Sequence, residues 1–404
     1  MVLLAAFLGW MFDGMEMGIF PLVAAPALRE MNPGLQGAEI PKYIGFWMGW
    51  ATAFFLWGAA LGGVVFGWLG DRVGRVRAMS LSILTYSLFT GLSYFATEPW
   101  HLPAFRFIAA LGMGGEWSLG VALVMESWPE KHRPMLAGAI GSAANVGFAL
   151  IAVLGIFFPV TESSWRWVML VGAAPALLTF FIRIFVPESE KWKEAVKAGP
   201  SQPLREIFSS GLLKTTLLAV AFASIVLIVT WGAVQWMGLW ADQMAGREQP
   251  RAKAYTQAFS ALGAVIGCPI GAWIGGRFGR RPAFFCLCLA SLIAGSLLFR
   301  GVHEYGATFL FMAFVVGGLT ASFYGWLPLY LPELFPTRVR ATAQGLSFNF
   351  GRILAGIGAL QMGSLMQKFE GSYAQAGATI VLIYVLGLGL IWLAPETKNR
   401  PLPE

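Results

Sequence analysis

The sequence is poor in charge, and this shortage excludes an ordinary soluble protein. Charged residues make up 12% and apolar residues 57% of the 404 positions, whereas soluble domains carry roughly 25% charged residues. A chain this apolar could not keep its surface in water, so the composition indicates a bilayer. The net charge of +7 is therefore interpreted as membrane topology and not as affinity for nucleic acid.

Reactive side chains are also scarce. Cys268, Cys286 and Cys288 all fall within apolar runs, where we interpret cysteine as a small hydrophobe and expect neither a disulfide nor a metal site. The three histidines lie in loops or at the ends of apolar runs, which argues against a buried histidine relay. Neither G-x-x-x-x-G-K-[ST] nor H-E-x-x-H occurs. We expect no enzyme activity, no cofactor and no metal.

What the chain does contain is about twelve long apolar runs, most of them long enough to cross roughly 30 Å of hydrocarbon as a helix. They cover residues 2–26, 44–69, 78–96, 102–124, 135–158, 166–186, 215–240, 254–275, 283–299, 305–330, 341–366 and 374–394. One set of alternate loops holds 17 lysines and arginines and the other set holds 7. Because cytoplasmic loops are enriched in these residues, we expect a multi-pass protein of the cell (inner) membrane with both termini in the cytoplasm. No basic segment or cleavage site precedes the first run, so no cleaved signal peptide is expected.

Three motifs occur twice, at offsets of 205, 207 and 208 residues. The pairs are Asp71-Arg72-Val73-Gly74-Arg75 with Gly276-Arg277-Phe278-Gly279-Arg280, Glu126-x-x-Pro129-x-x-x-Arg133 with Glu333-x-x-Pro336-x-x-x-Arg340, and Pro187-Glu188-Ser189 with Pro395-Glu396-Thr397. The repeat predicts an all-α membrane protein with twelve transmembrane helices in two pseudo-symmetric six-helix bundles. We place the bundles at residues 1–186 and 215–404, joined by a cytoplasmic linker over 187–214 that carries short surface helices.

Charged residues inside the predicted spans mark a candidate site, because a charge in hydrocarbon is costly unless it is paired or faces a water-filled cavity. The first span carries Asp13 and Glu16, and the fourth carries Arg106 and Glu116. An acid beside a movable arginine changes its proton affinity with conformation. We therefore interpret these four residues as proton-coupling residues, with a static ion cluster as the alternative.

The second half has one deeply placed charge, Arg352, with Asn349 three positions earlier on the same helix face. Its counter-charge is either a first-span acid that reaches across the central axis or a bound anion. The planar guanidinium matches a carboxylate in two hydrogen bonds, so we assign Arg352 and Asn349 to substrate binding. Trp231, Gln235 and Trp236 of the seventh span are added to this set, although packing is an alternative explanation for the tryptophans.

The charged loops predict a cytoplasmic gate, in which carboxylates lie beside arginines at helix ends. The residues assigned to it are Gly67, Asp71, Arg72, Gly74, Arg75, Glu126, Arg133, Arg277, Arg280, Glu333 and Arg340. Gly276 stands where the first copy of the motif has Asp71, so the two copies should not hold the cytoplasmic side closed equally strongly. The alternative is that these residues are topology signals only.

The run Gly67-Trp68-Leu69-Gly70-Asp71-Arg72-Val73-Gly74-Arg75-Val76-Arg77 resembles the signature of the major facilitator superfamily between its second and third spans. The run from Arg106 through Arg133, with its E-x-x-P-x-x-x-R motif, and the later Pro-Glu-Ser and Pro-Glu-Thr-Lys tags resemble the sugar porters and metabolite:proton symporters, in which a first-span acid and the fourth-span arginine couple to a proton. Gly114-Gly115-Glu116 resembles the metabolite:proton group. Phe348-Asn349-x-Gly351-Arg352 resembles organic-anion and sialate-type carriers. The seventh span lacks the Q-x-x-G-x-N pattern that sugar porters use for hydroxyl groups.

The resemblance implies a secondary transporter that works by alternating access. We predict that it moves a small organic anion, a carboxylate, by proton symport. A sugar or polyol symporter or facilitator and a carrier-like substrate sensor remain as alternatives. The expected partners are the organic anion, the proton and the lipid bilayer, with no nucleic acid, and the expected state is a monomer.

Overall fold

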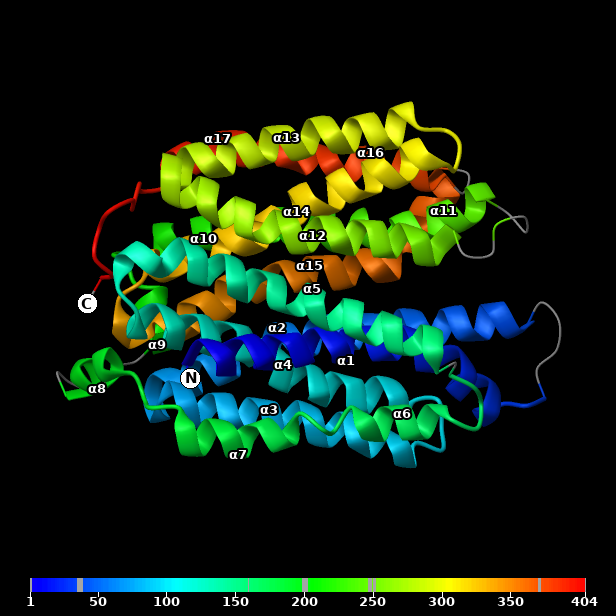
Figure 1. Cartoon of the computed structure of the whole chain (residues 1–404), viewed down its shortest axis with the longest axis horizontal. Coiled ribbons are helices and arrows are strands. Elements are labelled where there is room, and N and C mark those ends of the chain that lie inside the picture. Colours follow the sequence, from blue (N-terminus) through cyan, green and yellow to red (C-terminus); the bar gives the residue numbers. More distant parts are fainter. Residues whose placement is uncertain are drawn as a thin grey trace.

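The computed structural model describes residues 2–34, 39–158, 160–197, 203–245, 249, 252–369 and 372–403. Residues 198–202 of the predicted linker, with Pro200, lie outside the described residues. Helices account for all regular structure in the described part of the chain (Figure 1).

The helices of the first half are α1 (Val2–Met31), α2 (Glu39–Val73), α3 (Arg75–Leu92), α4 (His101–Ser127), α5 (Arg133–Phe157), α6 (Trp165–Val171) and α7 (Ala176–Phe185). Two short helices follow, α8 (Glu190–Lys197) and α9 (Pro203–Ile207). The second half contains α10 (Leu213–Gly232), α11 (Met237–Ala245), α12 (Ala252–Phe278), α13 (Arg280–Gly301), α14 (Ala307–Leu334), α15 (Arg340–Lys368), α16 (Tyr373–Ile380) and α17 (Tyr384–Leu390). Short 3₁₀ turns are η1 (Ser93–Phe95), η2 (Glu130–His132), η3 (Val234–Trp236), η5 (Thr337–Val339), η6 (Val381–Ile383) and η7 (Ile391–Leu393).

Nine segments of the described residues are by themselves long and apolar enough to cross a membrane. The other three predicted spans correspond to α3, to α6 with α7, and to α15, which lie alongside the nine in Figure 1. The sixth predicted span is interrupted between α6 and α7, where Pro175 precedes the first residue of α7; proline has no N–H with which to continue the preceding helix. The seventh is interrupted by η3 between α10 and α11.

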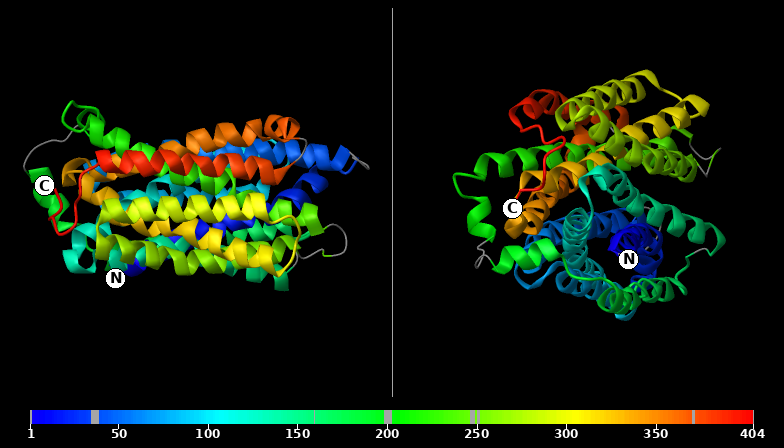
Figure 2. Two further views of the ribbon diagram at one scale, coloured as in Figure 1. Left: turned by 90° about the horizontal axis from the view of Figure 1, so that it is seen from above. Right: turned by 60° about the vertical axis from the view of Figure 1, so that its left-hand side comes forward.

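The helices form two bundles that meet along a long interface, and Figure 2 shows the bundles from two further directions. Across this interface α2 packs along α15, and α5 packs along α12 and α14. Gly63 and Gly345 allow the first of these contacts, because a Cβ on Gly345 would lie 1.9 Å from the Gly63 carbonyl oxygen. The two backbones therefore touch, and motion of one bundle against the other must break this contact.

Both termini lie at one end of the molecule, together with α8 and α9 (Figure 1). We call this the terminal end, and the other the opposite end. Large apolar side chains such as Leu88, Trp273 and Leu297 are exposed on the flanks, as expected where lipid covers a protein.

Candidate functional site

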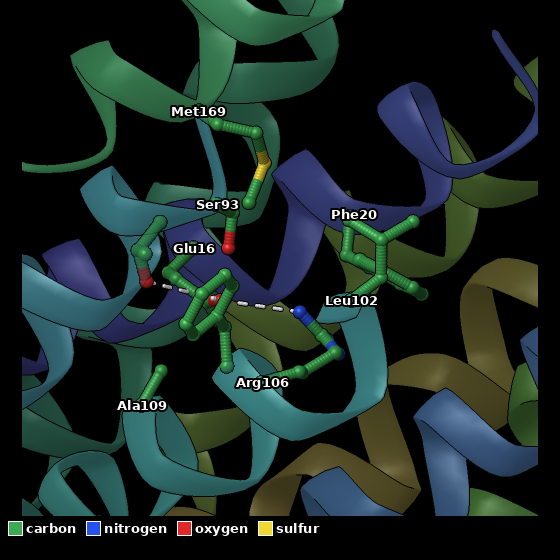
Figure 3. Close-up of a pocket in the computed structure, with 9 residues that line it drawn as sticks. Glu16, Phe20, Ser93, Leu102, Arg106, Ala109 and Met169 are labelled. Atoms are coloured by element: carbon green, nitrogen blue, oxygen red, sulfur yellow. Dashed lines mark hydrogen bonds and ion pairs between the residues drawn. The ribbon is translucent and has the colours of Figure 1, made fainter. Parts of the chain in front are cut away.

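The two acids of α1 are both buried but have different neighbours. Glu16 Oε1 accepts hydrogen bonds from Arg106 Nη1 of α4 at 3.1 Å and from Thr90 Oγ1 of α3 at 3.4 Å (Figure 3). The Arg106 guanidinium also lies over the rings of Phe20 and Phe55, 4.1 and 4.5 Å from their centroids. Glu16 and Arg106 therefore form a buried ion pair that three helices and two aromatic rings hold in place.

A small cavity adjoins this ion pair. Its volume is about 10 Å³, enough for about one water molecule. Thr90 and Ser93 of the first bundle line it together with Glu16 and Arg106, and apolar side chains such as Met169 complete the wall (Figure 3). The Oε2 atom of Glu16 has no hydrogen-bond donor among the described residues, so a water molecule here would have a polar partner.

Asp13 faces the other acid of the first bundle, Glu116 of α4. Their carboxyl groups lie close enough for a side-chain hydrogen bond between them. Gly9 makes room for this contact, because a Cβ at that position would lie 1.7 Å from Glu116 Oε1. Both oxygens of Glu116 and Oδ1 of Asp13 lack a donor among the described residues. Two ionised carboxylates at this separation would repel each other, and a proton on one of them would turn the repulsion into a hydrogen bond.

Arg352 of α15 faces the first bundle across the central axis. Its guanidinium carbon lies 5.5 Å from the centroid of the Phe348 ring, and its charge interacts with Asp13 and with the Tyr324 hydroxyl. Its Nε atom has no acceptor among the described residues, although the side chain is buried. Of the two first-span acids, Asp13 is thus the one whose charge acts on Arg352.

Asn349 lies one turn from Arg352, but its amide nitrogen is already used in hydrogen bonds to backbone carbonyl groups. Its Nδ2 atom donates to the carbonyl oxygens of Gly114 in α4, at 3.1 Å, and of Gly345 in its own helix, at 3.0 Å. Only its Oδ1 atom is left without a partner among the described residues. Asn349 therefore ties the two bundles together beside Arg352.

Three aromatic residues close the site toward the terminal end. Trp117 of α4 and Phe348 of α15 stack across the bundle interface, with centroids 3.8 Å apart and planes at 16°. Trp10 of α1 meets both rings edge-on. Sequence reasoning missed this cluster, although each of its members lies within about one turn of a buried charged residue in its own helix.

The seventh-span residues lie elsewhere, toward the opposite end. Trp236 stacks on Tyr373 at the start of α16, with centroids 6.1 Å apart, and its Nε1 donates to the carbonyl oxygen of Trp231. The Trp231 ring packs at 6.1 Å from Phe55 of α2. Gln235 is exposed. The structure does not bring these three residues into the group formed by Asp13, Glu116 and Arg352.

At the terminal end, a buried network joins the two bundles. Arg75 contacts Asp71 Oδ1 at 2.6 Å, Glu126 Oε1 at 3.2 Å and, across the interface, the carbonyl oxygen of Thr337 at 2.8 Å. Glu126 Oε1 also accepts from Arg340 Nη1 of the second bundle at 2.9 Å. Because every charge in this network is buried and paired, separating the bundles here would leave charges without partners.

Asp71 makes a second contact across the interface. Its carboxylate accepts from the backbone N–H and the hydroxyl group of Thr342, at 2.8 and 2.5 Å, at the start of α15. A carboxylate at a helix N-terminus satisfies N–H groups that have no partner within the helix. Gly67 allows the close approach, since a Cβ there would lie 2.7 Å from the Ala341 carbonyl oxygen.

The repeated Pro-Glu-Ser and Pro-Glu-Thr motifs cap equivalent helices. Glu188 accepts from the backbone N–H of Arg75 at 2.9 Å, at the start of α3, and Glu396 accepts from the N–H of Arg280 at 2.9 Å, at the start of α13. The residues before these helices, Gly74 and Gly279, have φ of 110° and 104°, a region that favours glycine. Sequence reasoning found the repeat but not the capping role of the two glutamates.

Glu396 lies outside the membrane-spanning segments, and its surroundings favour the charged form. Partial burial raises the pKa of this carboxyl, but backbone N–H groups of Arg280, Arg281 and Lys398 donate to it, and the net effect is a pKa below its usual range. Glu396 therefore stays ionised near neutral pH and keeps the tail attached to α13.

In the second bundle, Glu333 takes the place of Glu126. It accepts from Arg280 Nη2 at 2.6 Å and from the Thr397 hydroxyl at 2.6 Å, and Arg133 of the first bundle lies 3.8 Å away. The side chains of Arg72 and Arg277 are exposed and lie outside the network. Arg72 stacks over Trp68 instead.

The chain after α17 adds backbone acceptors to this network. The carbonyl oxygen of Pro403 accepts from the Thr337 N–H at 3.2 Å and from Arg340 Nη2 at 2.8 Å. The carbonyl oxygen of Arg400 accepts from Arg133 Nη1, across the interface, at 3.4 Å. Residues 395–403 thus support two of the residues that cross between the bundles.

The chain was compared with known families, curated proteins and solved structures. The profile of the Major Facilitator Superfamily matches residues 2–359. The chain is 30% identical to a putative metabolite transport protein of Haemophilus influenzae, over 99% of this chain and 97% of that protein. It is 31% identical to a gentisate transporter of Corynebacterium glutamicum, over 87% of this chain and 78% of that protein.

Among solved structures, the chain is similar to the proton:xylose symporter XylE bound to 6-bromo-6-deoxy-D-glucose. The TM-score is 0.80 at 17% identity, over 99% of this chain and 97% of that one. At this identity the likeness concerns the fold alone. Together with the family match it confirms the predicted class, an all-α membrane protein with two six-helix bundles.

Proposed function

The chain is a member of the major facilitator superfamily, a multi-pass membrane transporter and not an enzyme, and on that premise we propose that it carries a small organic anion by alternating access and proton symport. The proposal rests on the surroundings of Arg352. This cation is buried at the bundle interface, and its Nε has no acceptor among the described residues. A carboxylate supplies two charged acceptors in the plane of the guanidinium, whereas the hydroxyl groups of a neutral sugar do not match this planar fork.

Relatives support an acidic substrate. Curated proteins that match most of this chain include a gentisate transporter and a cis,cis-muconate transport protein, and both compounds are carboxylates. Phe348 lies beside Arg352, with Trp117 stacked on its ring and Trp10 edge-on to both, so the surroundings of Arg352 are aromatic and suit a planar acid. We therefore favour a mono- or dicarboxylate over a sugar or polyol.

Alternating access requires one end to close while the other opens. The network at the terminal end holds the bundles together in this structure, through Asp71, Arg75, Glu126 and Arg340. The excess of lysine and arginine in the loops of this end favours a cytoplasmic location for it. The structure then corresponds to a carrier closed toward the cytoplasm, with bundles over residues 1–186 and 215–404 that move about the linker 187–214.

Uptake into proteoliposomes tests this function. Labelled gentisate, cis,cis-muconate and glucose are offered with and without an imposed inward proton gradient. We expect at least one carboxylate, and not glucose, to accumulate when the gradient is imposed. Arg352→Lys keeps the charge but loses the planar fork, so binding should weaken by about 1–3 kcal/mol, or roughly 5- to 150-fold. Arg352→Ala should nearly abolish uptake.

The control is Arg300→Ala, which removes an exposed arginine at the end of α13 and should leave uptake unchanged. Equal transport of glucose by the wild type and Arg352→Ala would refute the anion assignment. Arg352 would then be a structural partner of Asp13.

A further inference from the structure

The charges at the centre of the molecule do not balance if every group is ionised. Three acids, Asp13, Glu16 and Glu116, are buried with two arginines, Arg106 and Arg352. Glu16 and Arg106 compensate each other at 3.1 Å. Asp13 and Glu116 then share Arg352, which leaves one negative charge in excess within the membrane, where an uncompensated charge is costly.

The contact between Asp13 and Glu116 shows where the balancing proton lies. The two carboxyl groups are within hydrogen-bonding reach, and Gly9 leaves space into which the Glu116 carboxyl fits. No other donor among the described residues reaches Glu116. One hydrogen shared between the two groups satisfies both the contact and the charge balance.

The surroundings of this pair contain few other ionisable groups. Tyr86 of α3 lies near all three acids, Glu16 lies one turn along α1, and Arg352 faces Asp13 from α15. Tyr86 remains a neutral phenol near neutral pH, and Glu16 is neutralised by Arg106. The charge seen by the pair therefore changes only when something binds at Arg352.

We propose that Asp13 and Glu116 form a carboxyl dyad that holds one proton in the empty carrier and takes up a second when a substrate anion binds Arg352, while Glu16 and Arg106 stay an ion pair. This proposal rests on the proposed function. In the empty carrier, one negative charge on the dyad balances Arg352. A bound monoanion adds a negative charge, and one proton from outside, which forms a second O–H bond on the dyad, removes it. Both leave on the other side, so the stoichiometry is one proton per monoanion and no net charge moves.

Amide variants separate the two protons. In Glu116→Gln or Asp13→Asn the amide N–H can donate the hydrogen bond that the shared proton makes in the wild type. The contact is then kept, so both variants should fold. Each single variant keeps one carboxylate, which can still take up the second proton, so we expect both to accumulate substrate against a gradient. The double variant Asp13→Asn/Glu116→Gln has no carboxylate left in the dyad, and we expect it to exchange substrate across the membrane but to lose accumulation.

Infrared spectroscopy of the purified carrier tests the dyad without any substrate. The wild type at neutral pH should show the carbonyl band of a protonated carboxylic acid, shifted in deuterated buffer. This band should disappear in both Glu116→Gln and Asp13→Asn. It should remain in Glu126→Gln, because Glu126 is paired with Arg75 and Arg340. A band that persists in both dyad variants, or is absent from the wild type, overturns the proposal.

Labelled gentisate in proteoliposomes tests the stoichiometry. In the wild type, an imposed potassium diffusion potential alone should not drive accumulation, whereas a pH gradient should. If no carboxylate is transported but the band behaves as expected, the dyad stands and the proposed function fails. If gentisate accumulates and the band persists in both variants, the dyad fails and the proposed function stands. Accumulation driven by the potential alone would overturn the one-to-one stoichiometry.

Discussion

At the scale of single residues, the position of a buried carboxyl group depends on a glycine. Gly9 lies one turn before Asp13, and the space a side chain would fill there is occupied by Glu116. Trp10, Trp117 and Phe348 close the same region on the terminal side. The absence of a Cβ at Gly9 therefore makes room for the Glu116 carboxyl beside Asp13.

Gly9→Ala should therefore act on coupling. Its methyl group would meet Glu116 Oε1 at 1.7 Å, so Glu116 must move, at an expected cost of about 1–3 kcal/mol. We expect a lower melting temperature and a loss of uphill uptake. Gly49→Ala is the matched control, because a Cβ on Gly49, also in a helix, has nothing within 4 Å; it should be neutral or slightly stabilising. Unchanged coupling in Gly9→Ala would show that the contact with Asp13 is dispensable.

The sequence predicts which charges are buried but not how they pair. Asp13 and Glu16 are three residues apart, a spacing that places them near one face of the helix. In the structure they point to different partners, Glu116 and Arg106. The choice depends on how α1 is rotated against α4, and tertiary packing sets that rotation. Hydropathy and spacing carry no information about it.

At the scale of elements, the segment after α17 contributes to the closed gate through its backbone. Removing residues 399–404 would delete the carbonyl oxygens that Thr337, Arg340 and Arg133 contact. We expect a shift of about 1 kcal/mol, roughly five-fold, toward forms open at the terminal end. Distances between spin labels on α2 and α14, at their residues nearest the terminal end, would measure it, with the exposed Cys286 replaced by serine.

Arg400→Ala is the control for this truncation, since Arg400 contributes its backbone carbonyl and its side chain is exposed. It should leave the distances unchanged. If the truncated chain also keeps the wild-type distribution of spin-label distances, the segment packs on the gate without stabilising it.

The elements themselves were largely predictable from hydropathy. The interruptions of the sixth and seventh spans were not, because the runs 166–186 and 215–240 remain apolar through them. Pro175 was the one local signal for the first interruption. The turn at η3 has no proline within it, so periodicity alone could not locate it.

At the scale of the whole molecule, the two bundles repeat the same caps but not the same contact across the interface. Asp71 accepts hydrogen bonds at the start of α15. Its counterpart Gly276 instead packs against Pro134 at the start of α5, where a Cβ on Gly276 would lie 2.5 Å from the proline ring. The sequence predicted this asymmetry from the missing acid. It could not predict that backbone acceptors of the tail reach both networks, Pro403 at Thr337 and Arg340 and Arg400 at Arg133.

Asp71→Asn should accordingly open the terminal end. The change weakens charge-assisted hydrogen bonds to Thr342 and Arg75, each worth about 1.5–3 kcal/mol, enough for a shift of ten-fold or more. The spin-label distances described above report it. Arg72→Ala, next in the chain but outside the network, should have no effect. An unchanged distribution in Asp71→Asn would assign the motif to assembly or topology.

The contact of Pro403 with the gate also bears on how the protein is handled in the laboratory. A purification tag or fluorescent reporter fused directly after residue 404 would begin next to the Pro403 carbonyl group, which accepts from Thr337 and Arg340. A bulky fusion at that point would pull on the gate and distort kinetic measurements. A reporter inserted between α13 and α14, at residues 302–306 at the other end of the molecule (Figure 1), would leave this contact untouched.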